Sequence, residues 1–441
     1  MKKKEKISLF WFRRDLRLDD NKGLYEALKG DYPVIPLFIF DKEILNKLPN
    51  NDHRVSFIFE TLQNMRNKLQ DEYNSSIDFR YGKPEKIFKD LIQNYDIAEI
   101  YTNNDYEPYA QQRDDAIKKL LDEHDINFHT FKDQVIFEKD EVVKDDGDPY
   151  VVYTPYKNKW REKFNASNNL EIYYINDYTG NFYQNTRLPQ ITLSDMGFKK
   201  SSIVLPEFDV TPTLIAGYAD TRDFPAENGT SHLGPYLRFG LVSIRKMMKK
   251  AYSSTGYTFM NELIWREFFM QILWHFPHTA NQAFREKYDT IPWRDAPDDL
   301  QKWKDGKTGY PIVDAGMRQL NETGYMHNRV RMVVASFLCK HLLIDWREGE
   351  QYFAEKLFDY DMSSNVGNWQ WAAGSGVDAA PYFRVFNPEL QFKKFDKNGE
   401  YVRQWVPEYF GVGYVQPMVD HNEARERAIE TYKTALQNYD K

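Results

Sequence analysis

Cysteine is almost absent from this sequence, because Cys339 is the single one among 441 residues. One thiol cannot form an internal disulfide, a thiolate zinc site or an iron–sulfur cluster, so we expect no metal centre and a reducing, cytoplasmic location. Long apolar runs are missing too, since no segment reaches the roughly 18 residues of a membrane helix. The start "MKKKEKISLFWF" turns polar at Arg13 without a cleavage site, so neither a signal peptide nor a membrane partner is expected.

An excess of positive charge is also lacking. Lys and Arg number 59 against 66 Asp and Glu, which gives a formal net charge of -7. A polyanion such as a nucleic acid must therefore be bound by a local basic patch rather than by bulk charge. Aromatic residues, in contrast, are abundant, with 30 Tyr, 30 Phe and 10 Trp. Such a composition favours a ligand with large flat rings.

Signatures of several common enzyme classes are missing. No G-x-G-x-x-G follows the first predicted strand, which disfavours a nicotinamide dinucleotide site. The segment "GKTGY" from Gly306 resembles the end of a P-loop, but Gln301 stands where that loop requires glycine. H-E-x-x-H and G-x-S-x-G motifs are absent as well. The acidic segment 138–148 has Val142 where an EF-hand needs its first Asp, so it is predicted to be an exposed loop.

The first 132 residues alternate between two hydrophobic periods. Short β-branched and aromatic runs predict strands near 7–12, 33–40, 76–81, 98–102 and 127–131. Apolar spacing of three and four predicts helices over 21–29, 55–73, 84–95 and 107–123. This alternation is typical of a Rossmann-like α/β domain, in which helices cover both faces of a parallel sheet.

The remaining chain changes character twice. Residues 133–205 are rich in Asn, Ser and Tyr with little periodicity, which predicts a long interdomain linker. From residue 206 onward helical spacing dominates and strand patterns vanish. We therefore predict an α/β domain over 1–132, a linker over 133–205 and an all-α domain over 206–441.

Two segments of the helical half combine polar and aromatic side chains. In "NETGYMHNRVRM", His327 precedes a polar cluster in which Asn328, Arg329, Arg331 and Met332 lie within about one helical turn. In "NELIWREFF", Glu262 lies four residues before Arg266, so both occupy one helix face. Together these segments offer hydrogen-bonding, cationic and stacking groups. Helical ion pairs and core aromatics explain either segment alone equally well.

The stretch "FDYDMSSNVGNWQWAAGSGVDAAPYFRVFNP" is more unusual. It places Asp359, Asp361, Asn365, Trp369 and Trp371 where an ordinary core would use Leu and Val. Two acids and an amide so close together suggest hydrogen bonds to a ligand with many donors. The alternative is a loop of solvated acids.

At these segments the sequence resembles the DNA photolyase/cryptochrome family, and specifically its bacterial class I cyclobutane pyrimidine dimer photolyases. The resemblance covers nearly the whole chain, including "WFRRDLRLDDN", "YTPYKNKW", "GTSHLGPYLRFG", "NELIWREF", "GKTGYPIVDAGMRQL", "MHNRVRM" and "NWQWAAGSGVDAAPYFRVFNP". It implies an N-terminal α/β antenna domain, a long linker and a helical FAD-binding domain. The implied activity is light-driven dimer repair, by electron transfer from photoexcited reduced FAD to a flipped-out dimer.

The resemblance also implies roles for single residues. Asn365 would face the reactive central-ring nitrogen of the flavin, where a neutral amide can help to hold the active reduced anionic form. A tryptophan chain would carry electrons from the surface to oxidised FAD through Trp369, Trp346 and Trp303. The residues implied to bind FAD are Tyr218, Thr230, Ser231, Leu233, Asn328, Arg331, Asp359, Asp361 and Asn365.

On the substrate side, Glu262 is implied to be catalytic, kept partly protonated by burial so that it hydrogen-bonds the dimer. The flipped dimer would be lined by Glu262, Trp265, Arg266, Asn328, Met332 and Trp371, and DNA phosphates would be bound by Lys157, Arg222, Arg329 and Arg384. Glu107 matches an antenna-contacting position. The antenna chromophore would be methenyltetrahydrofolate or a deazaflavin, although no cysteine–lysine pair of folate-binding relatives is found around Asn281.

Some positions depart from the family pattern. His232 replaces a common arginine and Gly234 a common serine beside the expected pyrophosphate site, and Tyr325 stands where Trp is usual. The alternative function is a cryptochrome-type blue-light photoreceptor without repair activity. Asn365 favours repair, because related plant cryptochromes carry Asp there. A (6-4) photolyase is disfavoured, since Asn328 stands where that class has His. We expect damaged DNA as the partner and a monomeric protein.

Overall fold

The computed structural model describes residues 5–254 and 256–439, and the chain forms two compact units. Unit 1 comprises residues 1–138, 164–204 and 233–250, and unit 2 comprises residues 139–163, 205–232 and 251–441. The domain boundaries predicted from the sequence stay a prediction. No helix in the described part of the chain is long and apolar enough to span a membrane.

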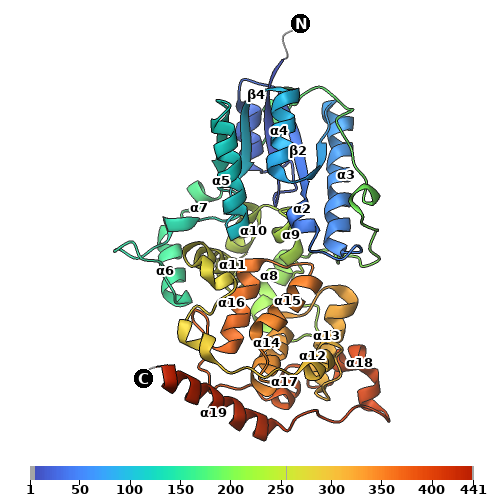
Figure 1. Ribbon diagram of the computed structural model, residues 1–441, viewed down its shortest axis with the longest axis vertical. Coiled ribbons are helices and arrows are strands. Elements are labelled where there is room, and N and C mark those ends of the chain that lie inside the picture. The colour runs from blue at the N-terminus through green and yellow to red at the C-terminus, as the bar shows by residue number, and fades with distance from the viewer. Residues whose placement is uncertain (1–4, 255, 440–441) are drawn as a thin grey trace. The chain divides into compact units, whose positions relative to one another are not determined.

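Unit 1 contains a parallel five-stranded sheet in the order β3-β2-β1-β4-β5 (Figure 1). Its strands are β1 (Lys6–Phe12), β2 (Val34–Asp41), β3 (Asp78–Gly82), β4 (Asp96–Asn103) and β5 (Asn127–Phe131). Its α-helices are α1 (Lys22–Lys29), α2 (Lys42–Leu45), α3 (His53–Tyr73), α4 (Pro84–Asn94), α5 (Pro108–Asp122), α7 (Ala166–Asn169), α9 (Gly234–Arg238) and α10 (Ile244–Ser253), whose last three residues belong to unit 2. The predicted strands and crossover helices of the α/β domain are confirmed, with ends that coincide or are shifted by at most two residues.

Alternation along β1 explains the layering of unit 1. Phe10 and Phe12 point into a buried cluster with α1 and α3, whereas Leu9 and Trp11 point into a second cluster with α4 and α5. Both faces of the sheet are thus covered, which is why β1 and β2 read as continuous apolar runs. Successive strands add outward from β1 to β3, and the chain then returns to the other side with β4.

Unit 2 is helical, and its described residues form no strand ladder. Its α-helices are α6 (Tyr153–Lys163), α8 (Pro212–Thr221), α11 (Tyr257–His275), α12 (Pro297–Lys304), α13 (Pro311–Thr323), α14 (Asn328–Ser336), α15 (Trp346–Lys356), α16 (Met362–Ala373), α17 (Pro388–Phe395), α18 (Glu400–Trp405) and α19 (His421–Tyr439). The predicted all-α class is confirmed. Helix α6 lies in the stretch that the sequence analysis treated as an irregular connector.

Polar residues fix where the site-bearing helices begin. The His327 ring accepts a hydrogen bond from the backbone N–H of Arg329 at the start of α14. The Asp361 carboxylate accepts one from Ser364 at the start of α16. Both side chains satisfy N–H groups that a helix terminus otherwise leaves unpaired. Helices α13 to α16 surround one large buried cluster that includes Trp303, Trp346 and Trp369.

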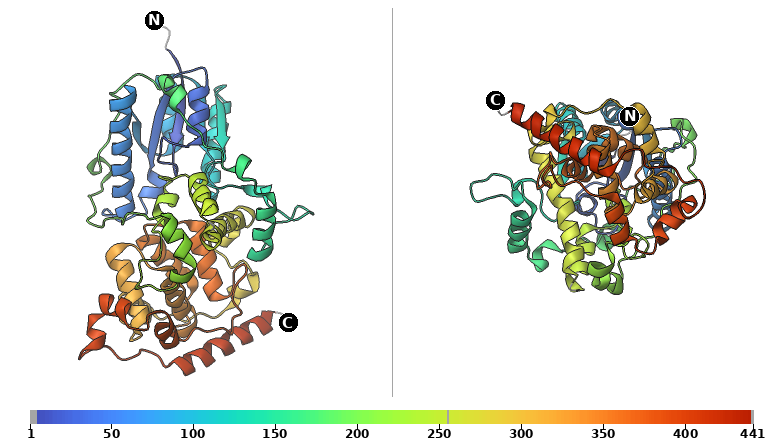
Figure 2. Two further views of the ribbon diagram at one scale, coloured as in Figure 1. Left: turned by 180° about the vertical axis from the view of Figure 1, so that it is seen from behind. Right: turned by 90° about the horizontal axis from the view of Figure 1, so that it is seen from below.

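The last helix, α19, lies along the outside of the other helices of unit 2 (Figure 2). Tyr432 and Leu436 of α19 pack into a small buried cluster with Tyr288 and Leu343. At its N-terminal end, the His421 ring lies 2.9 Å from the ring of His341, measured from Nδ1 to Nε2. His341 belongs to a π-helical turn, Phe337–His341, that follows α14.

Candidate functional site

A cavity of about 360 Å³ opens in unit 2 between α11, α14 and α16. This volume lies within the range of small-molecule sites. It is lined by Arg222, Glu262, Trp265, Arg266, Phe269, Asn328, Arg331, Met332, Ala335, Phe353, Leu357, Asp359, Tyr360, Asp361, Ser364, Asn365, Asn368, Trp369, Trp371 and Ala372. Most residues that the resemblance assigned to FAD or to the dimer are therefore brought together in one place.

Helical spacing explains this convergence. On α11, Glu262, Trp265, Arg266 and Phe269 follow one another at intervals that keep them on one face. On α14 the cavity-lining residues are Asn328, Arg331, Met332 and Ala335, and on α16 they include Ser364, Asn365, Asn368, Trp369, Trp371 and Ala372. Each of the three helices therefore contributes a stripe of polar and aromatic side chains to the same cavity.

Glu262 and Arg222 form an ion pair in the cavity wall. Burial raises the pKa of the Glu262 carboxyl above its usual range, while the charge and the hydrogen bond of Arg222 oppose that rise. The balance leaves the Glu262 pKa raised. Its proton affinity is therefore higher than that of a surface glutamate, so its carboxyl is more readily present as a hydrogen-bond donor.

Arg331 and Asp359 form a second ion pair, with Arg331 Nη2 2.9 Å from Asp359 Oδ2. Arg331 Nε also donates to the carbonyl of Met326 at 2.7 Å, which holds the guanidinium in place. The other oxygen of Asp359, Oδ1, is buried and has no hydrogen-bond partner among the described residues. A buried, unpaired carboxylate oxygen is costly unless a ligand donates to it.

Asn365 is buried, and the NH2 group of its side-chain amide is held by hydrogen bonds to Glu350. Nδ2 donates to the backbone oxygen of Glu350 at 3.1 Å and to Glu350 Oε1 at 2.9 Å. Burial raises the pKa of Glu350, and the hydrogen bond from Asn365 opposes that rise. Since both hydrogens of Nδ2 are used, the amide oxygen is the atom left to accept a hydrogen bond from a ligand.

The three tryptophans assigned to the electron relay are all buried, with exposed fractions of 0% for Trp303 and 2% for both Trp346 and Trp369. The rings of Trp303 and Trp369 lie 6.1 Å apart at an interplanar angle of 71°. None of the three reaches the surface. Two half-buried tryptophans, Trp293 and Trp405, pack against the same buried cluster and were not singled out from the sequence.

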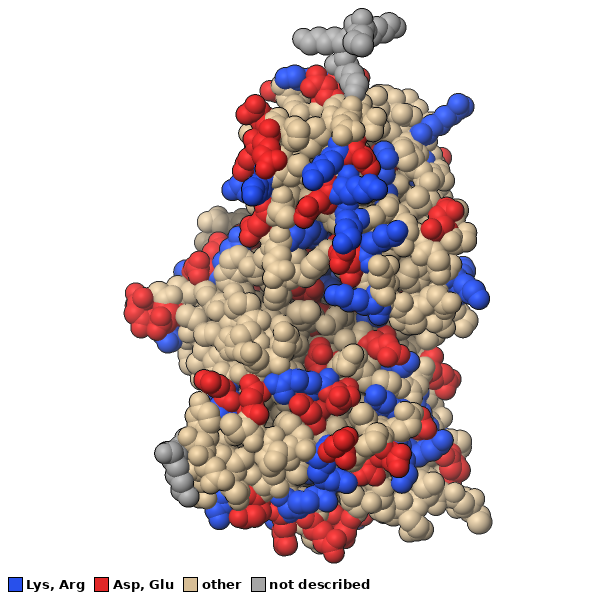
Figure 3. All heavy atoms as spheres, viewed as in Figure 1, with Lys and Arg blue, Asp and Glu red and all other residues tan. Residues whose placement is uncertain are grey.

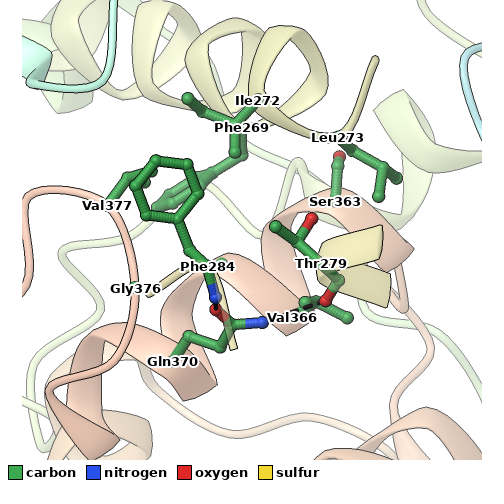
Figure 4. A pocket seen from close by; sticks show the side chains of 11 residues that line it. Phe269, Ile272, Leu273, Thr279, Phe284, Ser363, Val366, Gln370, Gly376 and Val377 are labelled. Atoms are coloured by element: carbon green, nitrogen blue, oxygen red, sulfur yellow. Dashed lines mark hydrogen bonds between the residues drawn. The ribbon is translucent and has the colours of Figure 1, made fainter. Parts of the chain in front are cut away.

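Side chains of α11 and α16 lie close together beside the cavity (Figure 4). Phe269 lines both the main cavity and a small void of about 10 Å³ between α11 and α16. A Cβ atom added at Gly367 would lie 2.3 Å from Phe269 Cδ1. Gln370 closes the far side, where its amide oxygen accepts from the backbone N–H of Phe284 at 2.8 Å. The backbone at Gly367 therefore packs directly against the Phe269 ring, which leaves no room for a larger residue there.

Several residues assigned by the resemblance do not line the cavity. Arg329 is paired with Asp223 at 2.6 Å. Tyr218 lies outside the lining as well, with its ring centroid 5.5 Å from the guanidinium of the cavity residue Arg222. The Thr230 hydroxyl lies 3.4 Å from that of Tyr325. The remaining residues outside the cavity lining are Ser231, Leu233, Lys157, Arg384, Trp303, Trp346 and Glu107.

In unit 1, Glu107 accepts hydrogen bonds at the carboxyl edge of the sheet, where ligands of open α/β folds bind. Its carboxylate lies 2.8 Å from Arg14 Nη1 and 3.1 Å from Arg238 Nη1. Charged side chains of both signs are interspersed on the visible surface (Figure 3). The antenna assignment of Glu107 stays a prediction.

Some cavity residues were missed by the sequence analysis. Asn368 and Tyr360 contribute polar groups, and Phe269 and Phe353 contribute rings. A signal for Asn368 and Phe269 was available, because they follow Asn365 by three residues and Trp265 by four, which are spacings of one helix face. Tyr360 and Phe353 carried no such signal, since their orientation depends on how α15 and the turn after it pack.

Two family models match the chain. Residues 8–172 match the model described as DNA photolyase, and residues 259–412 match the FAD binding domain of DNA photolyase. Deoxyribodipyrimidine photo-lyase of Halobacterium salinarum is 35% identical, over 97% of this chain and 99% of the relative. The chain belongs to the DNA photolyase family. The protein of the same name from Escherichia coli is 34% identical, over 97% of this chain and 98% of the relative.

Solved structures of photolyases have the same fold. A bacterial class III photolyase from Agrobacterium tumefaciens superposes with a TM-score of 0.87 at 34% identity, covering 99% of both chains. An archaeal photolyase from Sulfolobus tokodaii, solved with two FAD molecules, gives 0.84 at 34% identity, over 97% of this chain and 99% of that one. A Synechocystis cryptochrome, at 24% identity, shares the fold with a TM-score of 0.86.

The cavity fits FAD. Residues 259–412 match the FAD binding domain of the family, and most of the residues that line the cavity lie in this range. FAD carries hydroxyl and N–H donors as well as large flat rings. The unpaired oxygen of Asp359 and the free amide oxygen of Asn365 can accept from such donors. The aromatic and aliphatic walls provide the surfaces against which flat rings pack.

Proposed function

We propose that the protein repairs cyclobutane pyrimidine dimers in DNA in a light-dependent reaction, with FAD bound in the cavity of unit 2. The observation that carries the proposal is the shared cavity. Residues assigned to FAD, such as Arg331 and Asn365, and residues assigned to the dimer, such as Glu262 and Trp265, line the same space. Electron transfer from a cofactor to a substrate requires this proximity. The names of the relatives support the same chemistry.

FAD, when bound, supplies light absorption and the transferred electron. The protein supplies positioning and electrostatics. Asp359 accepts through Oδ1, which has no partner among the described residues, and Asn365 accepts through its amide oxygen, since its Nδ2 group is engaged by Glu350. Glu350 holds the Asn365 amide in one orientation. A neutral amide next to the flavin ring disfavours an anionic ring less than a carboxylate would.

The dimer would enter the same cavity after extrusion from the duplex. Extrusion of a dimer costs less than that of an intact base, because its pairing and stacking are already damaged. Trp265 and Trp371 offer flat apolar surfaces to the extruded pyrimidines. Glu262, whose pKa is raised by burial, donates a hydrogen bond to the dimer when it carries a proton.

Phosphate contacts would supply salt-sensitive affinity for DNA. Of the four basic residues assigned to this role, Lys157 and Arg384 have no ion-pair partner among the described residues. Arg222 and Arg329 are paired with carboxylates, so their binding to phosphate requires an exchange of partners. We therefore assign the larger share of the salt dependence to Lys157 and Arg384.

A matched pair of variants tests the proposed substrate site. Trp265→Ala removes an aromatic ring of α11 that lines the cavity, and Trp274→Ala removes one from the same helix outside it. Binding of an oligonucleotide with one dimer, and of its undamaged counterpart, is measured in the dark by fluorescence anisotropy. We expect Trp265→Ala to lower the preference for the dimer by about tenfold, as loss of one stacked base predicts. An equal loss in both variants would contradict the assignment.

A further inference from the structure

Tyr153, the first residue of α6, lies flat against Trp265 of α11. The two ring centroids are 3.5 Å apart and the ring planes differ by 9°. Tyr153 is buried, whereas Trp265 is half-buried and lines the cavity. Tyr153 thus covers one face of the indole. The Trp265 ring also contacts Phe268 and Phe269 of its own helix, with centroids 5.6 Å and 5.5 Å away, and the part of the indole that these rings leave uncovered lines the cavity.

Tyr153 is itself held at both ends. Its hydroxyl donates to the backbone oxygen of Asn261 at 2.8 Å, and its backbone N–H donates to the carboxylate of Asp378. Asp378 has a φ of 47°, a left-handed conformation that costs free energy in a residue other than glycine. A strained residue of the segment after α16 therefore fixes the start of α6 directly at the stacked ring.

The rest of α6 is anchored to the same helix. Tyr156 and Trp160 follow Tyr153 at helical spacing, and all three are buried. The Tyr156 ring packs against Phe268 of α11 with centroids 5.2 Å apart. The indole N–H of Trp160 donates to Glu267 of α11. This double anchorage keeps the Tyr153 ring from following a movement of Trp265.

We infer that Tyr153 is a positioning residue for dimer recognition, which fixes the plane of Trp265 so that its cavity side stacks on an extruded pyrimidine. The inference rests on the proposed function. Aromatic pairs in proteins more often meet edge-to-face or offset, so this close, nearly parallel overlap constrains the orientation of Trp265 unusually strongly. An indole already held in its binding orientation loses less conformational freedom when the ligand binds.

The test compares three variants of the full chain loaded with FAD. Tyr153→Leu removes the flat ring, Tyr153→Phe keeps the ring without the hydroxyl, and Tyr156→Leu removes another α6 ring that packs on Phe268 instead of Trp265. The readouts are bound FAD by absorbance, the affinities for dimer and undamaged oligonucleotides, and the KM and kcat of light-driven repair.

We expect Tyr153→Leu to bind the dimer roughly threefold to tenfold more weakly, as loss of an aromatic pair predicts. Its FAD content, its affinity for undamaged DNA and its kcat at saturating DNA should stay unchanged, while KM rises. Tyr153→Phe should bind the dimer as tightly as the parent protein does, and Tyr156→Leu should keep the preference for the dimer over undamaged DNA. If Tyr153→Leu loses FAD, Tyr153→Met, which keeps bulk without a flat ring, takes its place with the same expectation.

Unchanged dimer affinity in Tyr153→Leu overturns the inference alone, provided that the parent protein prefers dimers. Equal losses in Tyr153→Leu and Tyr156→Leu also overturn it, because they show that α6 acts only as a packing element. A parent protein without any preference for dimers overturns the proposed function together with this inference.

Discussion

Gly349 allows α15 to approach α16, and replacing it with alanine perturbs the proposed electron relay. A Cβ atom at Gly349 would lie 2.1 Å from Trp369 Cη2 and 2.6 Å from Leu338 Cδ2. Since carbon atoms pack at about 3.5 to 4.0 Å, the indole must withdraw by about 1.5 Å. Trp369 is 2% exposed and touches Trp303, so it has little room to do so.

Overpacking of this kind costs about 1 to 3 kcal/mol, and the better helix propensity of alanine offsets up to about 1 kcal/mol. We therefore expect Gly349→Ala to lower the free energy of unfolding, by up to about 2 kcal/mol after the full offset. Urea unfolding followed by far-ultraviolet circular dichroism measures this change. The displaced indole should also slow photoreduction of oxidised FAD.

Gly217→Ala in α8 is the matched control, because its added Cβ meets nothing within 4 Å. It should leave photoreduction unchanged and stabilise the protein by up to about 1 kcal/mol. If Gly349→Ala proves as stable and as photoreducible as Gly217→Ala, the steric reasoning is refuted.

Two further predictions concern the surface end of the relay and the pH dependence of stability. The half-buried tryptophans Trp293 and Trp405 are the candidates for the surface end of the relay. Each is replaced by Phe, and photoreduction of FAD is measured in the presence of an external reductant; we expect one of the two replacements to abolish it. Photoreduction in both variants would exclude both residues. Burial lowers the pKa of His341 to about 3 and also lowers that of His421. Neutral rings are thus favoured in the fold, so stability is full above the unfolded pKa of about 6.5 and falls as pH decreases toward 3. Between pH 7.5 and pH 5, His341 should lower the free energy of unfolding by about 2 kcal/mol, which urea unfolding at the two pH values measures. The variant His341→Leu should lack this decrease. An equal pH dependence of the unfolding free energy in both proteins would contradict the prediction.

The surroundings of this histidine pair set the sign of the effect. The charged groups that act on His341 are Arg427 and the His421 ring of α19, and both oppose its protonation. His421 is further influenced by Arg425, Asp420 and Glu389, of which the two acids favour protonation. Burial is the largest cause for both rings, so the acid sensitivity follows from taking them out of water.

The α/β layers could be predicted because strand and helix periods differ sharply in the first 132 residues. Helix α6 was missed because its polar residues and Pro155 hide the buried face formed by Tyr153, Tyr156 and Trp160. That face becomes visible only when the spacing of the aromatic residues is counted, at three and four residues.

The individual residues of the candidate site could be predicted from the sequence, but the ion pairs and hydrogen bonds between them could not. Motifs pointed to Glu262 and Asp359, yet their partners depend on tertiary packing, since Arg222 lies 40 residues from Glu262 in the sequence. A sequence motif likewise does not show whether one of its side chains is exposed to solvent. Trp303 falls in a segment that matches the family, but only the fold shows that it is fully buried and cannot itself be the surface end of a relay.

The most direct test of the central claim is the loss of cyclobutane dimers from irradiated DNA incubated with the purified, reduced, FAD-loaded protein. Blue light is compared with darkness, and dimers are counted by a dimer-specific endonuclease assay. We predict light-dependent loss of dimers, with none in the dark. Persistence of the dimers in light, although FAD is bound and photoreducible, would contradict the account and would favour a cryptochrome-type photoreceptor instead.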